Sequence, residues 1–265
     1  QAQYATTRAS RALKRLEENM PIGGTAVGTG INTHPRFAAK VCVALSNQLG
    51  STFTEAANHP EAQAAKDSFV EAHGELKTIA VSLSKIANDI RLLGSGPRCG
   101  LGEIQLPATQ PGSSIMPGKV NPVICESVMM VCTQVIGADT TITWAGANGN
   151  LDLNVMMPVM AHNLLCSIRL LGNVADVFAE KCVSGIVANE ERCRELVELS
   201  MAMVTSLAPK IGYDNAAEIA KESVRTGKTV RHISREKKVL PEAELTAALD
   251  PIAMTGPGGH GSGGG

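Results

Sequence analysis

Aromatic residues are scarce in this chain: they make up 3% of its 265 residues, whereas 44% of the residues are hydrophobic. A core of this composition has to be built from Ala, Val, Leu, Ile and Met, which favours closely packed helices over an aromatic-rich β-sandwich. No segment of useful length alternates polar and apolar residues with the period of two that is typical of a β-strand. We therefore predict an all-α protein.

The chain also lacks an excess of charge of either sign, since its formal net charge is −1. This balance gives no electrostatic basis for binding nucleic acid or an anionic membrane surface. No uninterrupted apolar run approaches the ~18 residues of a membrane span. We expect neither nucleic acid nor a membrane as a partner, and an anionic small substrate would have to be met by local charge.

Paired cysteine motifs are missing as well. The seven cysteines include no C-x-x-C pair, their number is odd, and most lie in apolar helical patterns. We interpret them as reduced, buried thiols of a cytoplasmic protein. The histidines are scattered without the spacing of a metal site, so we expect no metal and no cofactor.

What the chain does have is apolar residues at helical spacing. The clearest case is segment 61–93, which follows an a/d-like seam through Leu76, Ile79, Ala80, Leu83, Ile86, Ala87, Ile90 and Leu93. Further helices are predicted over 1–20, 35–49, 121–143 and 158–182. The helix at 121–143 spreads its apolar residues around more than one face, which indicates burial on most sides.

Near residue 189 the pattern changes to short helices, predicted over 190–199, 215–225, 230–235 and 242–249. We therefore expect a central helical bundle domain over 1–187, a small helical domain over 188–255, and a disordered glycine-rich tail over 256–265. Long helices this apolar need more neighbours than one chain of this size supplies, so we expect burial against other subunits.

Segment 23–32 is rich in glycine, but it has no P-loop lysine and no preceding strand. Glycine allows a backbone to approach another element closely. We expect close packing here, either between elements or against a ligand, and not a nucleotide site.

The segment most informative about chemistry is 112–122, Gly-Ser-Ser-Ile-Met-Pro-Gly-Lys-Val-Asn-Pro. It ends a candidate functional loop over 99–122, within a long irregular segment over 94–122. Such a loop can place backbone N–H groups and a cation around a carboxylate while presenting a hydroxyl group to a reacting carbon. A structural interpretation remains open for each residue. Lys119 can be a solvated loop lysine, Asn121 an N-cap before Pro122, and Glu126 an acid favoured by the helix dipole.

This string resembles the signature loop of the fumarase/aspartase superfamily, whose members eliminate a group from a succinyl-type substrate to give fumarate, or add it back. Segments 23–35, 148–154 and 211–221 resemble the class II fumarate hydratases in particular. The resemblance covers residues 1 to about 254 and corresponds to roughly the C-terminal half of a family polypeptide. It implies reversible hydration of fumarate to (S)-malate by a homotetramer with a helical core.

The resemblance also implies a role for each residue of the loop. Ser113 would be the base that removes the carbon-bound proton, and Ser114 would bind the substrate together with Lys119, Val120 and Asn121. Glu126 would interact with a histidine of a neighbouring subunit that serves the other half of the acid–base chemistry. A free serine is a weak base, so its alkoxide has to be stabilised by the N–H-rich loop.

The chain departs from the family pattern at its N-terminal side. It begins at Gln1, and neither the family's N-terminal domain nor its upstream Thr-His-type motif is present in the 265 residues. Active sites of the family draw on three subunits, and this chain offers one of the three contributing regions. We expect a fragment that is inactive alone. Two other functions stay open: aspartate ammonia-lyase, and a non-catalytic helical oligomerisation module.

Overall fold

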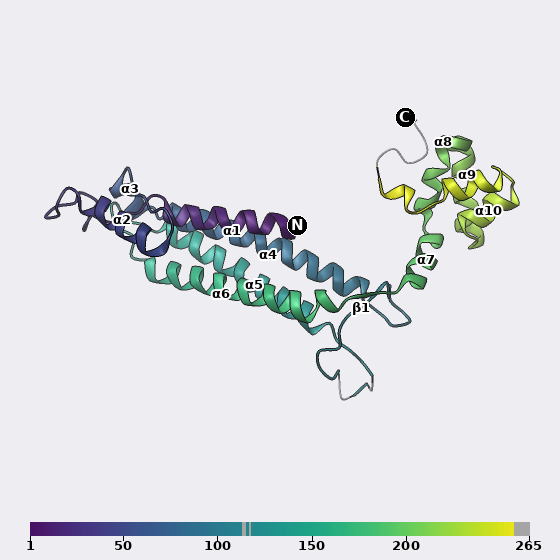
Figure 1. Cartoon of the computed structure of the whole chain (residues 1–265), viewed down its shortest axis with the longest axis horizontal. Coiled ribbons are helices and arrows are strands. Elements are labelled where there is room, and N and C mark those ends of the chain that lie inside the picture. The colour runs from purple at the N-terminus through teal and green to yellow at the C-terminus, as the bar shows by residue number, and fades with distance from the viewer. Residues whose placement is uncertain (113–114, 117, 257–265) are drawn as a thin grey trace. The chain divides into compact units, whose positions relative to one another are not determined.

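The chain folds as two units, Gln1–Val187 and Ala188–Gly265, and Figure 1 shows both as groups of helices. The computed structural model describes residues 1–112, 115–116 and 118–256. Among these, the β-strands are limited to a two-stranded sheet of β1 (Ile104–Gln105) and β2 (Val187–Ala188), besides two isolated β-bridges. The all-α prediction is confirmed. Residues 257–265, most of the predicted disordered tail, lie outside the described residues.

Four long helices form the first unit: α1 (Ala2–Glu17), α4 (Asp67–Leu93), α5 (Val123–Ala147) and α6 (Met157–Lys181). In Figure 1 they lie side by side as an elongated bundle. Helix α4 packs against α1 and α5, and α5 packs against α6. The predicted seam of α4 contributes to the core through the buried residues Leu76, Ile79, Ala80 and Ala87.

Helix α5 is the most apolar element of the bundle. Eight of its residues are buried: Cys125, Val128, Cys132, Val135, Ala138, Asp139, Ile142 and Ala145. Of the helices in the described part of the chain, it is the one long and apolar enough to cross a membrane by length and composition. The core helix of a bundle satisfies the same criterion, and α5 packs against both α4 and α6.

The helix predicted over 61–93 is in fact two helices, which corrects that prediction. A short helix α3 (His59–Ala64) precedes α4, and Lys66 lies between them with a φ of 59°. A left-handed residue places its Cβ against the following carbonyl and cannot continue a right-handed helix. The chain therefore turns at Lys66 before the long helix begins.

The glycine-rich segment 23–32 packs against the short helices at one end of the bundle. A Cβ on Gly23 would lie 2.8 Å from the Cβ of Ala38 in α2 (Phe37–Leu49), and one on Gly28 would lie 2.4 Å from the backbone of Pro60 in α3. Both glycines also have positive φ values, 92° and 85°. Close packing between elements therefore explains these glycines.

The second unit is built from short helices: α7 (Glu190–Leu199), α8 (Ala208–Ile211), α9 (Tyr213–Thr226), α10 (Val230–Glu236) and α11 (Glu242–Ala248), with the 3-10 helices η2 (Met201–Ser206) and η3 (Ala253–Thr255). Its own core contains the buried residues Met203, Leu207, Ile219, Val230, Ile233, Leu245, Ala248 and Leu249.

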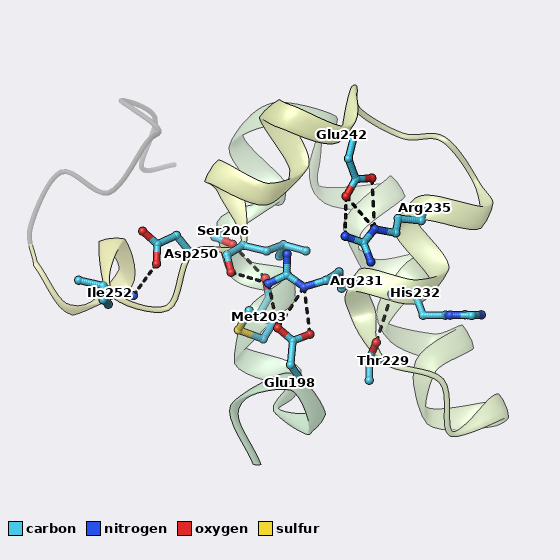
Figure 2. Close-up of polar contacts among 11 residues, drawn as sticks. Glu198, Met203, Ser206, Thr229, Arg231, His232, Arg235, Glu242, Asp250 and Ile252 are labelled. Atoms are coloured by element: carbon cyan, nitrogen blue, oxygen red, sulfur yellow. Dashed lines mark hydrogen bonds and ion pairs between the residues drawn. The ribbon is translucent and has the colours of Figure 1, made fainter. Parts of the chain in front are cut away.

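Polar contacts connect the helices of the second unit (Figure 2). The guanidinium of Arg231 donates to both carboxylate oxygens of Glu198 and to the carbonyl oxygen of Leu249. The side chain of Thr229 caps α10 by accepting a hydrogen bond from the backbone N–H of His232. Arg231 thereby ties α10 to the end of α7 and to the end of α11.

Candidate functional site

The loop predicted to carry the chemistry runs directly into α5. Its two predicted hydroxyl residues, Ser113 and Ser114, lie outside the described residues. Lys119 and Val120 are exposed, whereas Asn121 is half-buried. The structure therefore places the predicted substrate-binding stretch at the surface, immediately before the N-terminus of α5.

The two ends of the loop meet. A Cβ built on Gly112 would lie 1.4 Å from the carbonyl oxygen of Lys119, so the main chain at these two positions is in direct contact. The backbone N–H of Lys119 donates to the carbonyl oxygen of Met116 at 3.2 Å, and Gly118 has a φ of 78°. Glycine is required at 112 because any side chain would displace the Lys119 carbonyl.

The start of α5 has no side-chain cap. Pro122 is the N-cap residue, and Asn121 contributes only its main chain, whose carbonyl oxygen accepts from Val123 N–H at 2.9 Å. The alternative interpretation of Asn121 as the N-cap is therefore wrong. Among the described residues no side-chain hydrogen bond of Asn121 is found, so its amide is available to bind another group.

Glu126 lies in the first turn of α5, and its backbone N–H donates to the carbonyl oxygen of Pro122 at 3.1 Å. This place agrees with the dipole interpretation, because a carboxylate is favoured at a helix N-terminus. It also puts the half-buried Glu126 one turn beyond the loop. The role of Glu126 in acid–base chemistry stays a prediction.

Together these groups form an arrangement suited to an anion. The positive end of the α5 dipole, the Lys119 ammonium and the Asn121 amide are contiguous in the chain, and within the described residues no ion pair of Lys119 is found. Preorganised donors of this kind stabilise charge that develops on a carboxylate. Lys119 is the cation nearest to the uncapped N–H groups in sequence.

The loop is not enclosed by the described residues. Its apolar side chains are exposed: Ile115 by 86%, Met116 by 52% and Val120 by 51%. Active sites that stabilise an unstable anion usually exclude water from it. Another surface has to cover this loop before such chemistry is efficient.

The seven cysteines are all free thiols. Cys42, Cys125, Cys132 and Cys182 are buried as predicted, but Cys99 is exposed, which corrects the general expectation of buried thiols. The Sγ atoms of Cys125 and Cys182 lie 3.8 Å apart in a thiol–thiol hydrogen bond, and both cysteines are free. Burial, reinforced by this neighbouring thiol, raises the pKa of Cys125 to about 12, so it is neither a nucleophile nor a ligand at neutral pH.

Two of the histidines, His34 and His162, make local contacts. Nδ1 of His34 accepts from the backbone N–H of Arg36, and Nε2 of His162 lies 3.8 Å from Sγ of Cys166. Within the described ranges no group of three His, Cys, Asp or Glu residues is arranged to hold a metal ion.

One polar cluster of the bundle core was missed by the sequence analysis. His73 of α4 lies between Asp139 of α5, with Nδ1 3.0 Å from Oδ1, and Ser167 of α6, with Nε2 2.9 Å from Oγ. Ser167, His73 and Asp139 are connected in the same order as the residues of a Ser-His-Asp catalytic triad. However, Ser167 is only 1% exposed and His73 is fully buried. No substrate reaches them, so the cluster is structural. The sequence feature that could have revealed this cluster is Asp139, an acidic residue in the middle of an apolar helix.

Two family models match the chain. The lyase family model matches residues 1–137, and the model of the fumarase C C-terminus matches residues 203–256. The first match alone covers more than half of the 265 residues.

Curated relatives are similar over nearly the whole chain. The class II fumarate hydratase of Corynebacterium efficiens is 53% identical over 262 residues, which cover 96% of this chain and 55% of that protein. Fumarate hydratase 2 of Arabidopsis thaliana is 49% identical over 257 residues, covering 97% of this chain and 51% of that protein. The chain thus spans about half the length of the curated relatives it matches.

The chain is also similar to solved structures of the same family. The recombinant class II fumarase from Schistosoma mansoni matches with a TM-score of 0.91 at 37% identity, over 97% of this chain and 56% of that one. The fumarate lyase:delta crystallin from Brucella melitensis bound to cobalt matches with a TM-score of 0.88 at 49% identity, over 96% of this chain and 55% of that one.

Proposed function

The chain belongs to the fumarase/aspartase superfamily of lyases, in its class II fumarate hydratase branch, and on that premise we propose that it supplies one region of a fumarate hydratase active site. The reaction is the reversible addition of water to fumarate, giving (S)-malate. The region is the loop at 112–122 together with Glu126. The rest of the site comes from polypeptide that this chain does not include.

In the direction of elimination, Ser113 removes a proton from the malate carbon beside a carboxylate. The electron pair of the broken C–H bond moves into that carboxylate, which becomes an aci-carboxylate dianion. The C–O bond of the neighbouring hydroxyl group then breaks as the double bond forms, and the leaving oxygen takes a proton from an acid to depart as water. Glu126 orients the group that handles this second proton.

The dianion is the species that the loop has to stabilise. Lys119 provides its positive charge, and Asn121 an amide donor, while Ser114 and Val120 hold the remainder of the substrate. The observation that carries the assignment is that Asn121 does not cap α5, which leaves its amide beside Lys119 at an uncapped helix N-terminus. Removing one donor to such an anion typically costs roughly 10²–10³ in kcat.

The test is a chimera in which the part of the Corynebacterium efficiens relative that precedes the matched region is joined to Gln1. We expect malate to be converted to fumarate, followed by ultraviolet absorbance of the double bond. Ser113→Ala and Lys119→Met should each lower kcat/KM by roughly 10²-fold or more. Lys40→Met, at an exposed lysine of α2, is the matched control and should leave the rate unchanged. An active Lys119→Met chimera would refute the proposed role.

The same assay separates the alternatives. Aspartate ammonia-lyase activity would give fumarate and ammonia from aspartate and leave malate untouched. A non-catalytic oligomerisation module would convert neither substrate, even in a chimera that is folded and assembled. Conversion of malate but not of aspartate supports fumarate hydratase activity over both of these alternatives.

We also infer a homotetramer in the cytoplasm as the working form of the complete enzyme. Support for assembly comes from the exposed apolar residues of the long helices, such as Trp144 of α5, which is 71% exposed. Seven free cysteines fit a reducing compartment. Light scattering of the purified chimera measures the assembly directly, and a monomeric active chimera would contradict the tetramer.

A further inference from the structure

Two buried thiols lie side by side where α5 begins and α6 ends. Cys125 is in the first turn of α5 and is fully buried, and Cys182 is the C-cap residue of α6 and is 3% exposed. Their Sγ atoms are 3.8 Å apart in a hydrogen bond. A disulfide holds its two sulfurs about 2.0 Å apart, so this pair has to close by roughly 1.8 Å to form one.

The two thiols are not equivalent. Burial raises the pKa of Cys125 to about 12 and the neighbouring Cys182 adds to the rise, whereas the Arg91 guanidinium opposes it. Burial also raises the pKa of Cys182, but the hydrogen bond from Cys125 opposes that rise. Cys182 is therefore the thiol that an oxidant meets first, because it keeps some exposure and its thiolate has a hydrogen-bond donor beside it.

The pair lies between the two ends of the loop at 99–122. On the upstream side, β1 pairs with β2, and a Cβ built on Gly185 would lie 2.5 Å from Cγ of Pro107. The chain thus runs from Cys182 directly into a segment that packs on the upstream part of the loop. On the downstream side the loop continues into α5, whose first turn contains Cys125. A bond between the two sulfurs would connect the segments that support the loop on either side.

We propose that Cys125 and Cys182 are a redox pair that a peroxide converts to a disulfide, which holds the loop at 99–122 from both of its ends. The Cys182 thiolate first attacks one oxygen of hydrogen peroxide, so that the O–O bond breaks, Cys182 becomes a sulfenic acid and water leaves. The Cys125 sulfur then attacks the sulfenic sulfur, its proton leaves with the displaced hydroxide as water, and the S–S bond forms. Two thiols lose two electrons in total, and one peroxide is reduced to two molecules of water.

Burial slows the first step, and proximity favours the second. Because both pKa values are raised, little of either thiol is thiolate near neutral pH, and the pair stays reduced there. Once the sulfenic acid has formed, its partner is held beside it, and well-oriented intramolecular groups reach effective concentrations of about 10⁵ M or more. The pair is therefore a slow switch that responds to sustained oxidation, unlike the low-pKa thiols of fast redox sensors.

The first experiment detects the bond itself. The 265-residue chain carries Cys99→Ser, which prevents bonds between chains through the exposed thiol, and is treated with hydrogen peroxide at about pH 9, where more of each buried thiol is ionised. Peptide mapping by mass spectrometry without reduction should find the peptides of Cys125 and Cys182 linked, and dithiothreitol should release them. Unlinked thiols, sulfinic acids at both positions, or a bond of either residue to another cysteine would overturn the proposal.

The matched control is Cys132→Ala. Cys132 is a buried thiol of the same helix, and among the described residues it has no thiol contact. This variant should form the bond as the parent does, whereas Cys182→Ala should not. Loss of the bond in Cys132→Ala would assign the oxidation to a different pair and overturn the proposal.

The second experiment measures what the bond does to the loop. Hydrogen exchange of peptides that cover 99–128 should slow on the order of tenfold in the oxidised chain, because a cross-link between the supporting segments restricts local opening. Cys182→Ala given the same peroxide treatment should show no slowing, which separates the bond from other oxidation such as that of methionine. Unchanged exchange in a chain that carries the bond would overturn its hold on the loop. Neither readout uses catalytic activity, so failure here leaves the proposed function untouched.

Discussion

His73 on α4 and Asp139 on α5 are joined by a hydrogen bond of 3.0 Å in the middle of the bundle. Lys77, one turn along α4, donates to the other carboxylate oxygen of Asp139 at 2.6 Å, and Ser167 of α6 lies 2.9 Å from the second ring nitrogen of His73. The cluster thus connects three helices at one level of the bundle. A shift of any helix by one turn would leave buried polar groups without partners, so the cluster fixes their register.

Removing the carboxylate should therefore be much costlier than removing an exposed one. We expect Asp139→Ala to lower the free energy of unfolding by about 3 kcal/mol, because His73 and Lys77 lose their shared partner. Ser167→Ala should cost about 1 kcal/mol. The matched control is Asp89→Ala, at an exposed α4 residue paired with Lys85, with an expected loss under about 0.5 kcal/mol. Urea unfolding followed by circular dichroism gives all three values, and equal losses would contradict the register role.

The sequence predicted the helices well where apolar spacing determines them. Leu76, Ile79 and Ala80 of the predicted seam are buried in the bundle, because a long helix gains most of its stability from one packed face. The break at Lys66 could not be predicted, since lysine is an ordinary helix former and only tertiary packing forces its left-handed conformation. The partners of His73 come from residues 66 and 94 positions away, a distance over which local patterns carry no information.

The candidate site was predicted by the composition of its loop and by resemblance, but its geometry was not. Nothing in the string 112–122 indicates that Gly112 touches the carbonyl of Lys119, because that contact depends on the path of the chain between them. The failure of Asn121 to act as N-cap likewise follows from where α5 begins. The sequence identified the loop residues by their chemical type, and only the structure showed which atoms they contact.

The closure of the loop predicts a strong effect at Gly112. In the chimera described above, Gly112→Ala should lower kcat/KM on the order of 10²-fold, because the new methyl group displaces the main chain at Lys119. The unfolding midpoint should change little, since the loop lies outside the packed core. Gly74→Ala, at a helical position with no atom within 4 Å, is the control and should keep full activity. An active Gly112→Ala chimera would show that the position of Lys119 is not critical.

In the second unit, Arg231 should not be replaceable by lysine. Its guanidinium reaches both oxygens of Glu198 and the carbonyl oxygen of Leu249, whereas an ammonium group is a single point charge. We expect Arg231→Lys to destabilise this unit by about 1–2 kcal/mol. Hydrogen exchange of α10 and α11 measures the loss. Arg194→Lys, at a pair with Glu190 in which both side chains are about three-quarters exposed, should have no measurable effect.

Alkylation should divide the cysteines by burial. Cys99 is exposed and should react first with iodoacetamide in the native protein. Burial raises the pKa of Cys125 to about 12 and that of Cys132 to about 11, so both stay protonated and inaccessible near neutral pH. Mass spectrometry of digested, labelled protein should find them modified only after unfolding. Native labelling of Cys125 as fast as that of Cys99 would show that the bundle opens at this end.

The burial of the Lys66 side chain gives stability a pH dependence with a definite sign. Burial lowers the pKa of folded Lys66 below its ordinary value of 10.5, so the unfolded chain binds the proton more tightly. Protonated Lys66 therefore destabilises the free chain at neutral pH, and this cost disappears as pH rises through 10.5. Lys66→Met removes the charge while keeping a side chain with the same left-handed strain. We expect the variant to be more stable than the parent chain near neutral pH, with a gain that shrinks toward pH 10.5.

Urea unfolding of the free chain at both pH values measures this gain, with Lys40→Met as the control for an exposed lysine whose removal should show no such dependence. A Lys66→Met variant that is less stable than the parent chain at neutral pH would show that burial does not disfavour the protonated side chain in the folded state.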